Sequence, residues 1–191
     1  MNRKNVTKGV ILFLFCCLVL PGLARGQASK GHFVVDLGIA YTQATADDAA
    51  SGFVGLDIAA GKMVTSGLYL GIGTGADVVS YENIDDYHSR LVIFPLIVKA
   101  RYYFTFCQML QAHVSLAGGA YRASPHLASG PIGGVKYSKT QPGGSVGIGI
   151  DYYFLLMQGV TFEVEYHMFN TDYDDMFGYF AARVNYSVIK F

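Results

Sequence analysis

A group of titratable residues in this sequence has the types and spacing that acid–base or hydrolytic chemistry requires. Glu165 stands two residues before His167, so the two could act as a carboxylate and histidine pair. Such a pair needs a nearby serine to form a nucleophilic site. Position 169, on the same side of an extended chain, is Phe, and Ser115 and Ser145 belong to distant segments. The sequence therefore predicts no catalytic triad and no catalytic residue.

Glycine-rich spacing suggests a second chemistry, the cradling of a phosphate. Residues 71–76 read Gly-Ile-Gly-Thr-Gly-Ala, a loose form of the dinucleotide-binding pattern. That pattern needs a following helix whose N-terminus faces the pyrophosphate. The residues that follow, 77–80, read Asp-Val-Val-Ser and continue an extended segment. We expect a wall of small residues here, with neither a cofactor nor a metal bound by the chain.

Alternation of apolar with small or polar residues indicates the elements that must position these groups. An alternation of period two is typical of β-strands, and it recurs along the chain after about residue 30. No later run of apolar residues is long enough for a membrane-spanning helix, which needs about 20. The sequence predicts an all-β chain whose eight strands span residues 31–45, 52–63, 67–81, 90–104, 109–122, 141–154, 160–171 and 177–191.

The two faces of these strands differ in a way that favours a membrane barrel over a soluble sandwich. One face is large and apolar, whereas the other is rich in Gly, Ala and Ser with isolated charges. A sandwich or a soluble lipocalin-like barrel would instead bury the apolar face and show a polar one to water. A closed barrel is the β architecture that satisfies every backbone group in lipid. We therefore predict an eight-stranded antiparallel transmembrane β-barrel.

The lengths of the connections indicate the orientation of such a barrel. The second, fourth and sixth expected connections are short, at 64–66, 105–108 and 155–159. The first, third and fifth are longer, at 46–51, 82–89 and 123–140, while the seventh, 172–176, is short for this series. Short turns on one rim and longer loops on the other are typical of outer-membrane barrels, with the short turns periplasmic. Aromatic residues near strand ends, among them Tyr121 and Tyr179, fit the girdles at the two membrane surfaces.

Charged residues on the small-residue face predict an ion network that fills the barrel interior. Isolated buried charges are costly, so these side chains should pair with one another. Arg183 is expected at the centre, since it could reach both Glu165 and Asp36 across the barrel closure. A structural role is the expected one, and a proton- or ion-conducting path is the alternative. The expected lumen network comprises Asp36, Lys99, Arg101, Asp151, Glu163, Glu165, His167 and Arg183, with Asp57, Asp77 and His113 near it.

The N-terminal residues have the layout of a secretory signal peptide. Arg3, Lys4 and Lys8 precede an apolar run over 10–20, and small residues follow Pro21. Cleavage is expected after residue 26 or 28, which leaves residues 29–191 as the barrel domain. The remaining chain then has a single cysteine, so no intramolecular disulfide can form.

At this point the chain resembles the small bacterial outer-membrane β-barrels, the porin-like and OmpA/OmpX-like eight-stranded proteins. The resemblance rests on residues 94–104, Phe-Pro-Leu-Ile-Val-Lys-Ala-Arg-Tyr-Tyr-Phe, and on the terminal Phe191. It implies export to the outer membrane of a Gram-negative cell, with help from periplasmic chaperones. Phe191 would be the signal that the barrel-assembly machinery reads. Apolar residues usually alternate back from that aromatic, yet Ser187, Asn185 and Arg183 are polar, so we expect a bulge between Val188 and Ile189 or a departure of the last residues from the wall.

Three functions remain open for such a barrel. The first is a non-enzymatic, monomeric envelope protein with a filled lumen and a structural or surface-interaction role. The second is a small pore or channel, and the third is an enzyme that modifies lipid A, for which the sequence lacks a serine beside His167. Acidic residues at three expected loop tips could hold divalent cations among lipopolysaccharide phosphates, and basic ones in 123–140 could contact those phosphates directly. Polar tips that only face water are the alternative. A balanced count of 14 basic and 14 acidic residues, with no long basic run, argues against nucleic acid as a partner.

Overall fold

A computed structural model of the chain describes residues 30–45, 53–82, 88–107, 109–127, 139–155, 157–170 and 176–190. None of the described residues forms a helix long and apolar enough to cross a membrane. They form eight β-strands, in agreement with the number that alternation predicts. The strands are β1 (Phe33–Ala44), β2 (Phe53–Met63), β3 (Leu68–Glu82), β4 (His88–Cys107), β5 (Leu110–Leu127), β6 (Lys139–Leu155), β7 (Gln158–Asn170) and β8 (Met176–Lys190).

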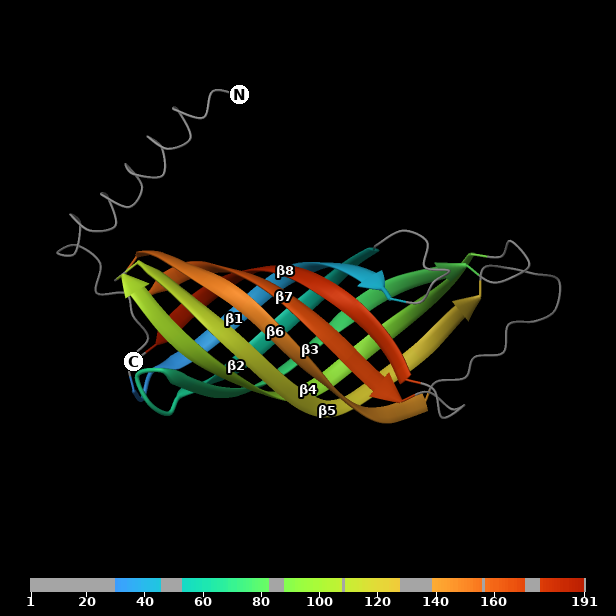
Figure 1. Ribbon diagram of the computed structural model, residues 1–191, viewed down its shortest axis with the longest axis horizontal. Helices are drawn as coiled ribbons and strands as arrows, with labels where there is room; N and C mark the ends of the chain where they lie inside the picture. Colours follow the sequence, from blue (N-terminus) through green and yellow to red (C-terminus); the bar gives the residue numbers. More distant parts are fainter. Residues whose placement is uncertain are drawn as a thin grey trace, which may run out of the picture.

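All eight strands join in one closed antiparallel barrel in which each pairs with its neighbours in the sequence. The first and last strands close the sheet through a continuous register from Phe33 opposite Lys190 to Ala44 opposite Tyr179. The ends of β2, β4 and β6 and the starts of β3, β5 and β7 lie at the same end of the barrel as the start of β1 and the end of β8, and we call it the turn end (Figure 1). We call the opposite end the loop end.

The outer surface is apolar because alternate residues of every strand point away from the lumen. Ile72 on β3, Val98 on β4 and Leu116 on β5 are each more than 60% exposed. A monomeric soluble protein rarely leaves a continuous apolar surface of this extent in water. Tyr41, Tyr102, Phe104, Phe106, Tyr152 and Phe154 are also exposed on this surface, close to the strand ends, as aromatic girdles are.

Several strands are longer than the alternation of residues predicts. β4 and β5 remain paired as far as Ser89 opposite Leu127, and the connection expected at 123–140 shrinks to 128–138. Pro125 lies within the extension of β5, although proline is a usual sign of a loop. Proline is tolerated at sheet edges where its missing N–H is not needed. The pairing of β4 with β5 therefore continues toward the loop end beyond Ala123 opposite Lys139, where the pairing of β5 with β6 stops.

The end of β8 corrects one expectation, the bulge or departure between Val188 and Ile189. Pairing with β1 runs without a shift through Val35 opposite Val188 and Val34 opposite Ile189. Ile189 is buried inside the barrel, next to Val34 and Met63, rather than on the lipid-facing side. The alternation looked broken because the lumen is apolar at this end, so an apolar residue also suits the inward position. Phe191 itself lies outside the described residues.

Candidate functional site

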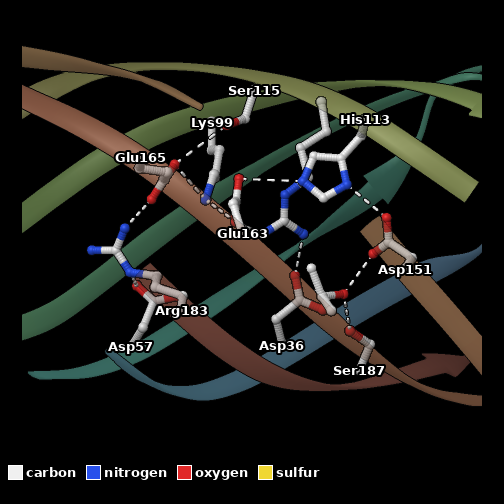
Figure 2. Close-up of polar contacts among 12 residues, drawn as sticks. Asp36, Asp57, Lys99, His113, Ser115, Asp151, Glu163, Glu165, Arg183 and Ser187 are labelled. Carbon is white, nitrogen blue, oxygen red and sulfur yellow. Dashed lines mark hydrogen bonds and ion pairs between the residues drawn. The ribbon is translucent and has the colours of Figure 1, made fainter. Parts of the chain in front are cut away.

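The charged interior of the barrel is the candidate functional site. It is a polar layer between two apolar clusters, and all eight strands contribute a buried ionisable side chain to it. Figure 2 shows how most of these side chains point toward one another. Every member of the expected lumen network is at most 3% exposed. The inward orientation follows from strand alternation, whereas the pairing depends on the register around the barrel. The members are Asp36, Lys99, Arg101, Asp151, Glu163, Glu165, His167 and Arg183.

Glu163 on β7 is the hub of this layer, since basic side chains from two other strands converge on it. Its Oε2 lies 3.0 Å from Lys99 Nζ and 3.0 Å from Arg101 Nη2, both on β4. Its Oε1 lies 3.3 Å from His113 Nε2 on β5. Lys99 also contacts Glu165, with 2.8 Å between Nζ and Oε1. β4 and β7 are not neighbours in the sheet, so these pairs cross the lumen and tie opposite walls together.

Arg183 on β8 forms a second cationic centre, but its partners differ from those expected. It pairs with Glu165 through Nη1 and with Asp77 through Nη2 at 3.2 Å, and its Nε is 3.8 Å from Asp57 Oδ1. Asp36 pairs instead with Arg101. The predicted contact between Arg183 and Asp36 is therefore wrong. In the register of β1 with β8, Asp36 lies opposite Ser187, while Arg183 lies opposite Ala40, nearer the loop end.

A histidine and a carboxylate form a separate pair at the turn-end side of the layer. His113 Nδ1 lies 2.6 Å from Asp151 Oδ2 on the adjacent strand β6. The other oxygen of Asp151 accepts a hydrogen bond from Thr161 Oγ1 at 2.5 Å, and the Thr161 and Ser187 hydroxyls are 3.1 Å apart. The sequence predicts His113 only near the network, whereas its contacts with Asp151 and Glu163 make it a full member.

The loop-end cluster closes one side of the polar layer with inward-facing apolar residues. Tyr121 and Tyr179, both fully buried, lie on either side of His167. The Tyr179 ring stacks on the imidazole at 4.7 Å between centroids, and the Tyr121 hydroxyl lies 3.0 Å from His167 Nδ1. Tyr179 also donates a hydrogen bond to Asp77 Oδ2 at 2.8 Å. The members of the loop-end cluster are Ala44, Val79, Ile93, Ile97, Ala117, Tyr121, Phe169, Tyr179 and Ala181.

The turn-end cluster closes the other side. Its tyrosines extend across the lumen, and the Arg101 guanidinium lies 5.5 Å from the centre of the Tyr69 ring. Its members are Val34, Met63, Tyr69, Tyr103, Tyr153 and Ile189. The sequence predicts Tyr121 and Tyr179 in the aromatic girdles, and the structure corrects that assignment because both rings are buried in the lumen. Their odd or even position in the strand predicts the inward orientation correctly. Tyr121 and His113, for example, are an even number of residues apart in β5 and so share a face.

Inward glycines create the space that these large side chains occupy. A Cβ on Gly149 would lie 2.5 Å from His113 Cε1, closer than real side chains approach. A Cβ on Gly143 would lie 2.7 Å from Tyr121 Cδ2. Glycine thus permits close approach of a ring to the wall in both cases. The Gly-Ile-Gly-Thr-Gly run at 71–75 lies wholly within β3, in agreement with the expectation of a wall rather than a phosphate loop.

The arrangement supplies ion pairing and hydrogen bonding rather than a nucleophile. Ser115 Oγ donates to Glu165 Oε1 at 3.4 Å, so this serine contacts a carboxylate instead of a histidine. Among the described residues, no group of three or more His, Cys, Asp or Glu side chains is placed to hold a metal ion. Within the part of the chain that the structure describes, several buried polar atoms of the layer form no hydrogen bond, including Oδ1 and Nδ2 of Asn185. The signal region and most of the expected charged loop tips lie outside the described residues.

Comparison with known proteins identifies the fold. No protein-family model matches the chain, and a comparison with curated proteins finds no match either. Among solved structures, neisserial surface protein A is similar, with a TM-score of 0.66, 16% identity and coverage of 83% of this chain and 99% of that one. OprG of Pseudomonas aeruginosa has a TM-score of 0.59 and 12% identity, covering 87% of this chain and 99% of that one.

A third similar structure is Ail of Yersinia pestis, solved in complex with the heparin analogue sucrose octasulfate. Its TM-score is 0.54 at 15% identity, over 83% of this chain and 99% of that one. At these identities the likeness concerns the path of the backbone, and it agrees with the strand order and closure described above. The chain has the fold of the small eight-stranded outer-membrane β-barrels.

Proposed function

We propose that this chain is an integral, non-enzymatic protein of the bacterial outer membrane, in a Gram-negative cell, exported through its N-terminal signal peptide. Its role is structural or one of surface interaction, and it acts as a monomer in contact with membrane lipid and lipopolysaccharide. Chaperones and the barrel-assembly machinery would act during biogenesis, with Phe191 as the signal they read. The fold of the similar outer-membrane barrels and the apolar outer surface support this location.

The filled lumen is the observation that carries the closed, non-conducting role. Ion pairs cross between β4 and β7, and an apolar cluster covers the layer on each side. A solute that entered would have to break buried ion pairs and displace buried tyrosines. Breaking a buried pair by removing one partner costs about 3–5 kcal/mol, so such a path opens rarely. The paired carboxylates also argue against hydrolysis, since they are engaged with cations.

The experiment combines membrane location with conductance. The full chain, expressed with its signal, should fractionate with outer membranes, and the folded protein should migrate differently on a detergent gel before and after boiling. In planar lipid bilayers it should give no discrete conductance steps. Identical migration with and without boiling, together with solubility in detergent-free buffer, would refute the membrane barrel. Regular steps would instead establish the small pore.

Enzymatic function has its own test. Lipid A incubated with the refolded protein should be recovered unchanged by mass spectrometry. A deacylated or acylated product that disappears in the His167→Ala variant would replace the proposal with an enzyme. His167 is the informative position because its ring lies between Tyr121 and Arg183, with 2.9 Å from Nε2 to Arg183 Nη1.

A further inference from the structure

We propose that the lumen binds a proton on His113, so that this side chain is an imidazolium held between two carboxylates and serves as a fourth cation of the polar layer. The inference deepens the proposed closed lumen. It assigns a chemical state to one residue, and this state can be tested whether or not the lumen conducts.

The positions of the two ring nitrogens carry the argument. His113 Nδ1 lies 2.6 Å from Asp151 Oδ2, and Nε2 lies 3.3 Å from Glu163 Oε1 without forming a direct hydrogen bond. A carboxylate only accepts hydrogen bonds, and a neutral imidazole carries a single N–H. A neutral ring would therefore turn one bare nitrogen lone pair toward a carboxylate oxygen. The doubly protonated ring presents an N–H toward both.

The charge balance of the layer points the same way. Among the lumen side chains that the structure describes, carboxylates exceed lysines and arginines by six to three. Uncompensated buried charge costs several kcal/mol per ion, so the layer favours any group that can take up a proton. The carboxylates are Asp36, Asp57, Asp77, Asp151, Glu163 and Glu165, and the cations are Lys99, Arg101 and Arg183.

His167 provides a contrast within the same lumen. Its Nε2 lies 2.9 Å from Arg183 Nη1, a group that can only donate, and 3.4 Å from Glu165 Oε2. Nε2 must therefore accept from the guanidinium, which requires it to be unprotonated. Its Nδ1 faces the Tyr121 hydroxyl, which can donate or accept. The two lumen histidines thus differ in the groups that their Nε2 atoms face.

Every strand packed around His113 contributes to its setting. β6 supplies Asp151 and the bare backbone of Gly149, where a Cβ would lie 2.6 Å from His113 Nε2. β7 supplies Glu163, and β4 supplies Tyr103, whose ring centroid is 5.3 Å from that of the imidazole. Two positively charged groups of β4 also contact Glu163, namely Arg101, which is paired with Asp36 as well, and Lys99, which is paired with Glu165 as well. The protonated His113 on β5 therefore connects Asp151 on β6 with Glu163 on β7, next to the turn-end cluster.

Nuclear magnetic resonance of the full chain labelled with ¹⁵N-histidine, folded in detergent micelles at pH 7.5, tests the assignment directly. Long-range ¹H–¹⁵N correlations distinguish a ring with two N–H groups from a ring with one. We expect both nitrogens of His113 to be protonated and His167 to show one protonated nitrogen. The variants His113→Gln and His167→Gln assign the two signals. A neutral tautomer at His113 would overturn the proposal.

A second measurement uses single carboxylate changes with the same readout. Asp151→Asn removes the partner of Nδ1, so the His113 signal should change to that of a neutral ring at the same pH. Asp77→Asn is the matched control, because Asp77 contacts Arg183 and Tyr179, and the signal of His113 should stay unchanged. An unchanged His113 signal in Asp151→Asn would contradict the proposal that Asp151 holds the proton on His113. A neutral His113 in a barrel that inserts and gives no conductance would reject this inference alone.

Discussion

Lys99 on β4 is joined to Glu165 on β7 through the interior of the barrel, with 2.8 Å between Nζ and Oε1. These strands are separated by β5 and β6 on one side and by the other four strands on the other. The pair therefore sets the distance between opposite walls rather than between neighbours. Arg101 and Asp36 make a similar connection between β4 and β1. The stability of the barrel should depend on these interior pairs as well as on its backbone ladder.

Replacing Arg183 with Met should lower stability strongly. The change leaves Glu165 and Asp77 without their Arg183 partner and removes the guanidinium near Asp57. Loss of one partner of a buried pair costs about 3–5 kcal/mol. The midpoint of urea unfolding from lipid vesicles should fall accordingly. Adding Glu165→Gln to Arg183→Met should recover part of the loss, and an unchanged midpoint in Arg183→Met would mean that Arg183 faces open water.

Removing a single hydroxyl from the loop-end cluster should give a smaller effect. Tyr179→Phe deletes the hydrogen bond to Asp77, and bonds to charged groups contribute about 1.5–3 kcal/mol. The control Tyr152→Phe removes a hydroxyl from an outward-facing ring and should change stability by less than about 0.5 kcal/mol. Urea unfolding in vesicles measures both. Equal effects of the two variants would contradict the inward role of Tyr179.

Conductance should appear only when both apolar clusters are opened. Tyr121→Ala with Tyr179→Ala truncates the loop-end cluster, and Tyr69→Ala with Tyr153→Ala truncates the turn-end cluster. Each pair of changes leaves the other cluster in place, so single-channel recordings should show no steps. The combined variant removes both clusters but leaves the ion pairs that cross the lumen, so its steps should be rare openings of the polar layer. If the loop-end pair alone produced steps, the turn-end cluster would not close the lumen.

A charge on the outer surface should destabilise the barrel in a depth-dependent way. Val98 lies in the middle of β4 and is 63% exposed, whereas Phe106 lies near the turn end of the same strand. Arginine costs about 2–4 kcal/mol at the midplane of a bilayer and about 0–1 near its surface. Val98→Arg should therefore lower the unfolding midpoint in vesicles much more than Phe106→Arg. Equal effects of Val98→Arg and Phe106→Arg would contradict a position of Val98 at the midplane and of Phe106 near the membrane surface.

Strand alternation predicts much of this fold from the sequence. It gives the strand number, the inward or outward face of most residues, and a filled interior at residues such as Lys99 and Glu163. It does not give the pairing of Asp36 with Arg101, because that contact depends on the relative shift of strands across the whole barrel. The prediction that Tyr121 and Tyr179 belong to the aromatic girdles is wrong for another reason. Their chemistry suits both a girdle and a lumen, and only their parity separates the two.

Closure of β1 onto β8 also has a consequence for biosynthesis. The partner of Phe33 is Lys190, so the first strand to be made finds its final neighbour only when nearly the entire chain is available. Until then the growing sheet has two open edges, and exposed strand edges pair readily with other chains. An incomplete chain is therefore an aggregation hazard over almost its whole synthesis. A truncation that removes β8 should yield aggregates rather than a smaller barrel, whatever stability the remaining strands retain.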